Sequence, residues 1–405
     1  MNYERISDNQ ALAGLCKRIE SAEVVAYDTE FVSEFNYYPD LCLVQVAFDD
    51  QLAIIDPKQR LDVEPFWQSL VAGKHETIVH AGREELLFCW RSVGEVPARW
   101  FDVQLAAGMV SMEYPISYRK LLKRLLDKTL PKGETRTDWR KRPLTESQLD
   151  YALHDVLDLR RVRDLLMDRL TELGRVDWLH DESELRIDKL LEAESQERWP
   201  RLSGFTSLSG SAVSIAVALW RWRDELARRR DTLPKRVLRD DLLVELARRG
   251  KSSEKQIRAI RGMQRRDYER YIPELSETIE RALHEPPPKG PNRQRVDLPQ
   301  QVQLLTQFLN TALACTCRAQ AISPSVVGTV QDVQDLIVHE LNLAPESDRE
   351  MPSLITGWRA EIVGDLLEKV LNGKVAMRLV DPLSDRPLQF IELADDRLPR
   401  SGCSH

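Results

Sequence analysis

The chain has 405 residues, of which 42% are hydrophobic and 30% are charged, and its formal net charge is −7. At about 150 residues per domain, this length predicts two or three domains, each able to bury a core. The sequence has no apolar run near the ~18 residues of a membrane span, and its first residues lack a charged-then-apolar leader pattern. Its six cysteines contain no CxxC pair, which disfavours a disulfide scaffold or a zinc module. We therefore expect a cytoplasmic protein with no membrane contact.

Strand-like apolar runs open the chain and indicate a mixed α/β domain. The first three have connections too short for crossover helices, so they should form an antiparallel meander: 24–27, 41–48 and 52–55. Two later strands should each precede a helix: strands 77–80 and 99–101, helices 84–91 and 103–109. A meander followed by alternating helix and strand predicts one mixed sheet with helices packed on its faces.

Two more helices are expected in this α/β region. Ser117 can cap a helix that runs to residue 128. Thr145 and Gln148 form a T-x-x-Q capping box for a helix that should continue to about residue 173. We expect one domain over residues 1–205, ending in a trailing helix.

From about residue 206 the strand signals stop. Helical patterns fill 206–285, a Pro-rich segment at 286–298 is typical of a linker, and a second helical block spans 299–372. The tail, 373–405, contains two strand-like runs that could pair as a hairpin.

Charge is divided unevenly along the chain. Residues 207–285 contain 18 Lys and Arg against 13 Asp and Glu, a net charge of +5 that leaves −12 for the remainder. An acidic body joined to a basic helical segment fits a catalytic domain that needs carboxylates and a second domain that meets a polyanion.

Three groups of polar residues stand at positions suited to chemistry. Asp28 and Glu30 end the first strand two residues apart, so both side chains face the same side of the sheet. Tyr151 and Asp155 are four residues apart on a helix and share one face. The third group, at 80–85, opens a helix after a strand. Each pattern alone also fits an ordinary strand end, helix face or helix start, but clustered carboxylates repel unless a cation lies between them.

Together these groups resemble ribonuclease D, a family of DEDD-type 3′→5′ exonucleases with a Tyr in the third motif. The resemblance rests on stretches similar to the three exonuclease motifs: 25–32 with 37–39 and 43–46, then 80–86, then 136–139 with 142–144 and 151–156. The segment 206–285 resembles an HRDC (helicase-and-RNase-D C-terminal) domain, and 299–372 resembles a second one. The resemblance implies a ribonuclease H-like mixed sheet with flanking helices, followed by two all-α HRDC-like domains.

The resemblance also implies residue roles. Asp28, Glu30 and Asp155 would hold the metal ion that activates water, Asp28 would bridge to a second ion, and Tyr151 would orient the water. Two divalent ions can stabilise the attacking and leaving oxygens, and carboxylate ligands favour Mg²⁺ or Mn²⁺.

One position departs from the family pattern. The second motif of the family supplies an Asp, and the register places Glu85 there, as a ligand of the second metal ion. Glu84 is the adjacent competitor, but neighbouring helix residues point about 100° apart. We interpret Asp102, at the end of a strand, as a helix cap.

Contacts with the substrate are less specific in the sequence. His80, Lys132 and Arg136 are candidates to bind the terminal nucleotide or its phosphates. A basic face on 117–128, and the Arg clusters at 228–230, 248–251 and 265–266, are candidate contacts with the nucleic-acid backbone.

These features lead to a main hypothesis and two alternatives. The main hypothesis is a monomeric, metal-dependent 3′→5′ exoribonuclease that trims the 3′ ends of tRNA precursors and other structured RNAs and releases nucleoside 5′-monophosphates. One alternative is a 3′→5′ DNA exonuclease, since contacts with a 2′-hydroxyl cannot be located in a sequence. The other is a non-catalytic RNA-binding module, suggested by the Glu at position 85.

Overall fold

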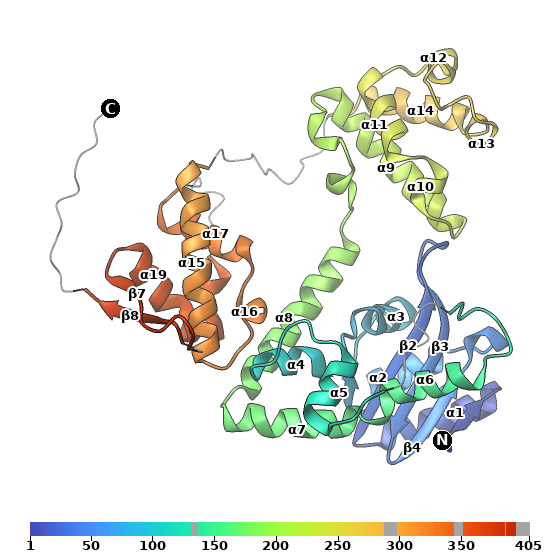
Figure 1. Ribbon diagram of the computed structural model, residues 1–405. Coiled ribbons are helices and arrows are strands. Elements are labelled where there is room, and N and C mark those ends of the chain that lie inside the picture. Colours follow the sequence, from blue (N-terminus) through green and yellow to red (C-terminus); the bar gives the residue numbers. More distant parts are fainter. Residues whose placement is uncertain (131–136, 287–297, 344–350, 385, 394–405) are drawn as a thin grey trace, which may run out of the picture.

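The computed structural model describes residues 1–130, 137–286, 298–343, 351–384 and 386–393. Three parts follow one another along the chain (Figure 1). We call them the N-terminal body (described residues up to 195), the middle helical unit (residues 199–286) and the C-terminal helical unit (described residues from 298 to 371). Among the described residues, no helix combines the length and the apolar character needed to cross a bilayer.

The N-terminal body is built on a six-stranded mixed sheet with the order β1-β4-β3-β2-β5-β6. The strands are β1 (Glu4–Ile6), β2 (Val24–Val32), β3 (Asp40–Phe48), β4 (Gln51–Ile55), β5 (Glu76–Val79) and β6 (Trp100–Asp102). Strands β2, β3 and β4 pair antiparallel, whereas β1 is parallel to β4, and β5 lies parallel between β2 and β6. The predicted meander and mixed sheet are confirmed, and β1 is a strand that the apolar pattern had not indicated.

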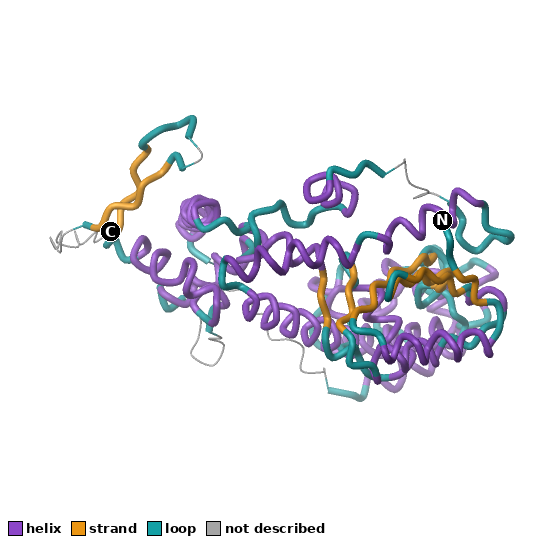
Figure 2. The backbone as a smooth tube through the Cα atoms, turned by 90° about the horizontal axis from the view of Figure 1, so that it is seen from below, coloured by secondary structure: helices purple, strands orange, loops and turns teal. Residues whose placement is uncertain are grey.

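Helices cover both faces of this sheet (Figure 2). One face packs against α1 (Asn9–Ser21), α2 (Glu64–Ala72) and α3 (Arg83–Val93). The other packs against α4 (Val103–Met109), α5 (Tyr118–Leu126), α6 (Glu146–Leu157) and α7 (Leu159–Glu172). Side chains alternate along β2, so Val25 and Tyr27 belong to the first core while Val24 and Ala26 belong to the second.

The capping box of α6 is present, because the Thr145 hydroxyl accepts from the Gln148 amide and the Gln148 side chain accepts from Thr145 N. The prediction of one continuous helix to residue 173 is wrong. The helix breaks at Asp158, which has φ −104° and ψ 2°. The Asp158 carboxylate is buried and lies 2.5 Å from Lys128 Nζ, so a tertiary ion pair accompanies the break. The local sequence around residue 158 did not predict this break.

Helix α8 (Val176–Ser195) leads out of the N-terminal body to the middle helical unit. That unit contains α9 (Ser211–Arg229), α10 (Pro234–Val237), α11 (Asp240–Arg249), α12 (Glu254–Arg258), α13 (Arg266–Glu269) and α14 (Ile272–Leu283). Its buried side chains form a core of their own, centred on residues such as Leu219, Leu243 and Leu275.

The C-terminal helical unit contains α15 (Gln300–Ala319), α16 (Pro324–Val327), α17 (Val330–Glu340), α18 (Gly357–Arg359), a short π-helix (Ala360–Gly364) and α19 (Asp365–Leu371). The tail then forms the predicted antiparallel hairpin, β7 (Val375–Leu379) with β8 (Leu388–Glu392). The hairpin stands apart from the sheet of the N-terminal body (Figure 2).

The C-terminal unit shares a hydrophobic core with the N-terminal body. Trp358 stacks on Trp178 of α8 with ring centroids 5.6 Å apart, and Val326 packs beside Gly108 of α4. The buried Arg175 donates to Met109 O and Ala321 O at 2.7 and 2.8 Å. The two regions therefore form one packed body.

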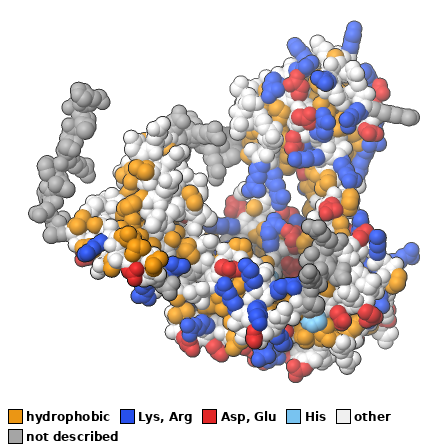
Figure 3. All heavy atoms as spheres, in the orientation of Figure 1, with side chains coloured by type: hydrophobic (Ala, Val, Ile, Leu, Met, Phe, Trp, Pro, Cys, Tyr) orange, Lys and Arg blue, Asp and Glu red, His pale blue; other side chains and the backbone are white. Residues whose placement is uncertain are grey.

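The middle unit instead touches the N-terminal body through the loop between β2 and β3. Asp231 accepts from Asn36 Nδ2 at 2.6 Å and from Tyr37 N at 3.1 Å. The Tyr37 hydroxyl donates to Asp224 at 2.8 Å. In the view of Figure 3, Lys and Arg side chains are spread over this unit, whereas hydrophobic side chains gather over α15.

Candidate active site

Strand β2 carries two carboxylates at the end that points toward the middle unit. Asp28 and Glu30 have the same parity as Val24 and Ala26, so they lie on the face of the sheet that α6 covers. Asp28 stands opposite Gln45 of β3, and Gln45 Nε2 donates to its carboxylate at 2.8 Å. The register of the pair shifts just after Glu30.

Helix α6 brings the third carboxylate to this face. One carboxylate oxygen each of Asp28, Glu30 and Asp155 lie within 4.8 Å of one another. Tyr151, one turn earlier on α6, donates its hydroxyl hydrogen bond to Asp155. The Tyr151 ring packs against Trp139 with centroids 6.1 Å apart. Residues from the first and third predicted motifs therefore meet in one place.

Helix α3 supplies Glu85 from the opposite side of β2. The Glu85 side chain is buried, and it accepts from the hydroxyl of Thr29 at 2.6 Å. Thr29 lies between Asp28 and Glu30 and points to the α3 face, as the strand alternation requires. Glu84 is turned outward and forms an ion pair with the neighbouring Arg83. Of the two adjacent glutamates, Glu85 is the one that borders the carboxylate cluster.

Burial raises the pKa values of all four carboxyl groups, and repulsion from the other carboxylates of the cluster adds to this effect for Asp28 and Glu30. The pKa of Asp28 lies well above its ordinary value. Burial is the largest cause, and repulsion from Glu85, Asp155 and Glu30 raises this pKa further. The same causes raise the pKa of Glu30 to about 8. Burial raises the pKa of Glu85 to about 7 and that of Asp155 to about 6, while hydrogen bonds from Thr29 and Tyr151 act in the other direction.

The donor set fits hard divalent cations. Three half-buried carboxylates within 4.8 Å of one another, with the buried Glu85 beside them, are unfavourable as anions without positive charge between them. Arg119 lowers the pKa of Asp155 through its charge, but burial has the larger effect and the pKa remains raised. Carboxylate oxygens are the ligands that Mg²⁺ and Mn²⁺ prefer. Gln45 Oε1, buried beside Asp28, is likewise without a partner among the described residues.

The other candidates are placed less centrally. His80 Nε2 donates to Ile116 O at 3.0 Å, and its ring packs 5.4 Å from that of Tyr118, so the described contacts of His80 are structural. Asp102 caps α4 as expected, and it also accepts from Ala81 N at 3.0 Å. Lys132 and Arg136 lie outside the described residues.

Many of the proposed backbone-contacting cations are engaged in ion pairs. On α5, Lys120 contacts Glu113 and Lys123 contacts Asp127. In the middle unit, ion pairs form within single helices: Arg228 with Asp224, Arg229 with Glu225, and Arg248 and Arg249 with Glu245. Lys251, Arg261 and Arg265 make no ion pair with a described residue, and they are the more available cations of that unit.

Two supporting residues were missed by the sequence reasoning. Gln45 and Thr29 bond two of the four carboxylates, and although both lie in stretches similar to the first exonuclease motif, neither was given a role. A signal for Gln45 exists in the sequence, because it is the one polar residue within the apolar run 41–48. A polar residue buried on a central strand needs a partner, and the nearest candidate on the neighbouring strand is Asp28.

Comparison with known proteins decides the family. A model described as "3'-5' exonuclease" matches residues 3–171, and one described as "HRDC domain" matches residues 214–279. Ribonuclease D of Pseudomonas paraeruginosa is 32% identical over 366 residues, which cover 90% of this chain and 96% of that protein. The chain belongs to the ribonuclease D family.

Further similarity to ribonuclease D extends over nearly the whole chain. Ribonuclease D of Zymomonas mobilis is 30% identical over 391 residues, 93% of this chain and 98% of that protein. The crystal structure of Escherichia coli RNase D, described as an exoribonuclease involved in structured RNA processing, aligns with a TM-score of 0.77 at 27% identity. The alignment covers 92% of this chain and 99% of that structure.

Membership in this family settles the general activity. The chain is a 3′→5′ exoribonuclease, a phosphodiester hydrolase, and the alternatives of a DNA exonuclease and a non-catalytic module are not favoured. The middle helical unit contains the HRDC domain, and the predicted fold class is confirmed for the mixed sheet and for this domain. The DEDD exonuclease family uses divalent metal ions, in agreement with the acidic cluster.

Proposed function

We propose that this exoribonuclease shortens the 3′ ends of tRNA precursors and other structured RNAs and releases nucleoside 5′-monophosphates. The E. coli relative is described as acting in structured RNA processing, which supports this substrate class. The single observation that carries the catalytic part is the meeting of Asp28, Glu30 and Asp155, from two distant motifs, within 4.8 Å. Holding these half-buried carboxylates together costs free energy unless a cation binds them.

We further propose that Asp28, Glu30, Asp155 and Glu85 hold two divalent ions, Mg²⁺ or Mn²⁺. When bound, such ions would neutralise the carboxylates and stabilise the charge that develops on the phosphate and on the leaving 3′ oxygen. Thr29 and Gln45 keep two of the carboxylates in fixed orientations through their hydrogen bonds.

We propose that Tyr151 orients the attacking water molecule. Its hydroxyl is tied to Asp155, and its ring is supported by Trp139, so the hydroxyl oxygen has a defined place at the edge of the acidic cluster. Burial and the neighbouring carboxylates raise the pKa of Tyr151, so the phenol stays protonated and acts as a hydrogen-bonding group rather than as a base. The attacking water would be aligned by this hydroxyl against the terminal phosphodiester.

The remaining parts of the proposal concern context. We propose that His80, Lys132 and Arg136 contact the terminal nucleotides. We also propose that residues 299–372 form a second HRDC-like domain. Finally, we propose that the protein acts as a monomer in the cytoplasm. The absence of a membrane-crossing helix among the described residues is compatible with that setting.

The test measures hydrolysis of a 3′-extended tRNA and of a matched DNA strand in Mg²⁺, in Mn²⁺ and in EDTA. We expect mononucleotide release from the RNA only with a divalent ion, and a loss of roughly 10³-fold or more in Asp28→Asn, because several kcal/mol of transition-state stabilisation disappear. The matched control is Asp8→Asn, which changes an exposed helix cap of the same body. Near-wild-type turnover in Asp28→Asn would refute the metal assignment.

The role of Glu85 has its own test. Glu85→Gln should raise the Mg²⁺ or Mn²⁺ concentration needed for half-maximal rate, whereas Glu85→Asp should be mild because it keeps the charge. Glu84→Gln is the matched control on the adjacent position. If Glu84→Gln is the damaging change, the assignment of the second motif is off by one residue.

A further inference from the structure

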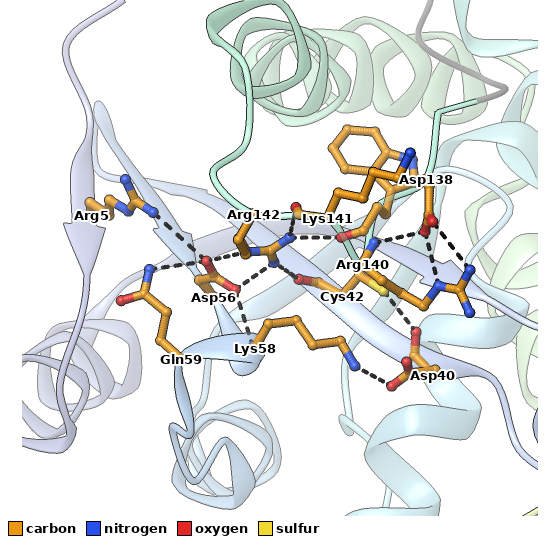
Figure 4. Close-up of polar contacts among 11 residues, drawn as sticks. Arg5, Asp40, Cys42, Asp56, Lys58, Gln59, Asp138, Arg140, Lys141 and Arg142 are labelled. Atoms are coloured by element: carbon orange, nitrogen blue, oxygen red, sulfur yellow. Dashed lines mark hydrogen bonds and ion pairs between the residues drawn. The ribbon is translucent and has the colours of Figure 1, made fainter.

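Arg142 lies outside the acidic cluster, yet it is the most completely bonded side chain near it (Figure 4). An arginine has five N–H donors, and all five are used here. Nε and one terminal nitrogen donate to the two oxygens of Asp56 at 2.7 and 2.5 Å. The other donors reach three backbone carbonyls, those of Trp139, Lys141 and Cys42, each at 2.8 Å.

These bonds join segments that are far apart in the sequence. Cys42 belongs to β3, Asp56 follows β4, and Trp139 and Lys141 belong to the segment that leads into α6. Asp56 is fully buried, and it also accepts from Lys58 N and Gln59 Nε2 at 3.1 Å. Burial alone would raise the pKa of Asp56, but the hydrogen bonds from Arg142, Gln59 and Lys58 and the charge of Arg142 together outweigh it and hold the pKa below its ordinary value. The Asp56 carboxylate is therefore charged throughout the neutral range.

The segment fixed by Arg142 supports the tyrosine of the site. Trp139, whose carbonyl accepts from Arg142, is buried and packs its ring against that of Tyr151. The two side chains belong to a small core between α6 and the sheet. Gln148 of α6 also donates to Thr137 at 2.8 Å, so the segment is attached to the helix at a second point.

We propose that Arg142 is a positioning residue for catalysis, which fixes the place of the Tyr151 hydroxyl through the backbone and ring of Trp139. This inference rests on the proposed role of Tyr151. Lysine cannot replace Arg142 in this role, because an ammonium group has three donors on a flexible stem and cannot bind a carboxylate and three carbonyls in one plane. A displacement near 1 Å of a catalytic group is enough to lower a rate by about 10²-fold.

The test is a double-mutant cycle that combines Arg142→Lys with Tyr151→Phe, measured with a single-stranded RNA and Mg²⁺. We expect Arg142→Lys to lower kcat by about 10- to 100-fold while KM changes by less than about twofold. In the Tyr151→Phe background the same substitution should lower kcat by less than about twofold, because the hydroxyl that Arg142 positions is already absent.

The matched control is Arg140→Lys, in the same segment. Arg140 is paired on the surface with Asp138 at 2.9 Å, and it takes no part in the bonds to Asp56. The Arg140→Lys variant should retain kcat within about twofold, both in the wild-type background and in the Tyr151→Phe background. Circular dichroism and the melting temperature are recorded for every variant, and Asp56→Asn replaces Arg142→Lys if the latter does not fold, since it weakens the same pair from the other side.

The outcomes separate this inference from the proposed function. If Tyr151→Phe keeps the wild-type kcat, the role of Tyr151 fails. If Tyr151→Phe is slow but Arg142→Lys keeps the wild-type kcat, or lowers it by the same factor in both backgrounds, the positioning role of Arg142 is overturned. A loss in kcat confined to the background that has the hydroxyl supports it.

Discussion

The C-terminal helical unit joins the N-terminal body through a shared apolar core, whereas the HRDC domain touches it through one loop, by hydrogen bonds and by the aromatic rings of Phe35 and Tyr37. The stacked pair Trp178 and Trp358 belongs to one continuous core. At the other seam, Asp231 bonds a backbone amide and an asparagine, and Tyr37 packs against an HRDC core whose buried residues all belong to the middle unit. Shared apolar burial makes two regions unfold together, while a few polar contacts leave each region its own stability.

The two units also differ in charge. Residues 207–285 carry a net charge of +5, whereas residues 299–372 contain four Lys and Arg against nine Asp and Glu, a net charge of −5. The basic unit is thus the one whose core is separate from that of the N-terminal body. An RNA backbone is expected to engage the HRDC domain, while the acidic unit serves the stability of the catalytic body.

The largest expected effect concerns the shared core. Trp358→Ala should lower the free energy of unfolding of the N-terminal body by about 3–5 kcal/mol, since it removes a buried aromatic side chain. The free energy of unfolding is measured by urea titration, with the rate of hydrolysis of a short RNA as the signal for the folded N-terminal body. The matched change Leu246→Ala in the HRDC core should lower only the HRDC transition and leave that hydrolysis in place. If both variants shift one common transition, the contrast between the seams is wrong.

The second effect is a dependence of stability on pH, confined to the catalytic body. Folding raises the pKa of Glu30 to about 8 and of Glu85 to about 7, so the folded state binds more protons than the unfolded state between about pH 5 and 8. In EDTA the melting temperature of the body should therefore fall as pH rises through that range. Mg²⁺ or Mn²⁺ should reverse the trend, because cations bind the deprotonated carboxylates. The HRDC transition should not respond, and a metal-free melting temperature that rises with pH would contradict the assignment.

A smaller effect is expected at the polar seam. Asp231→Ala removes the hydrogen bonds to Asn36 and Tyr37, worth about 1–2 kcal/mol at an exposed position. Hydrogen exchange should show faster exchange of the Tyr37 amide, with little change in the amides of β3. Asp267→Ala, an exposed change on α13, is the control. Unchanged exchange at Tyr37 would mean that the loop does not depend on the HRDC domain.

The smallest effect is on RNA affinity. Lys251→Gln and Arg265→Gln should each reduce the slope of log affinity against log salt by up to about 0.7, the contribution of one phosphate contact on a single strand. Binding is measured in the inactive Asp28→Asn background by fluorescence anisotropy. Arg318→Gln on α15 is the matched control and should leave the slope unchanged. If all three variants have the same slope as the parent protein, the HRDC domain is not the electrostatic contact with RNA.

Much of the fold could be read from local patterns. Strands β2, β3 and β4, and the hairpin β7–β8, follow from apolar runs with short connections, and α6 begins at its capping box. The break at Asp158 could not be read in this way, because its buried contact with Lys128 joins residues 30 apart in the chain. Strand β1 is three residues long, too short for a periodic signal.

The sequence by itself determined which residues are acidic, which of them share a strand or helix face, and which family they resemble. Strand parity alone places Asp28 with Glu30 on one side and Thr29 on the other. The resemblance already grouped Asp155 with the first pair and favoured Glu85 over Glu84. Only the tertiary structure gave the contacts that bring these residues together, and only it showed that Arg142 holds Asp56 and Trp139 together. Local pattern fixes the direction of a side chain relative to its own element. The packing of helices on the sheet fixes which elements face one another, and it depends on contacts between residues far apart in the chain.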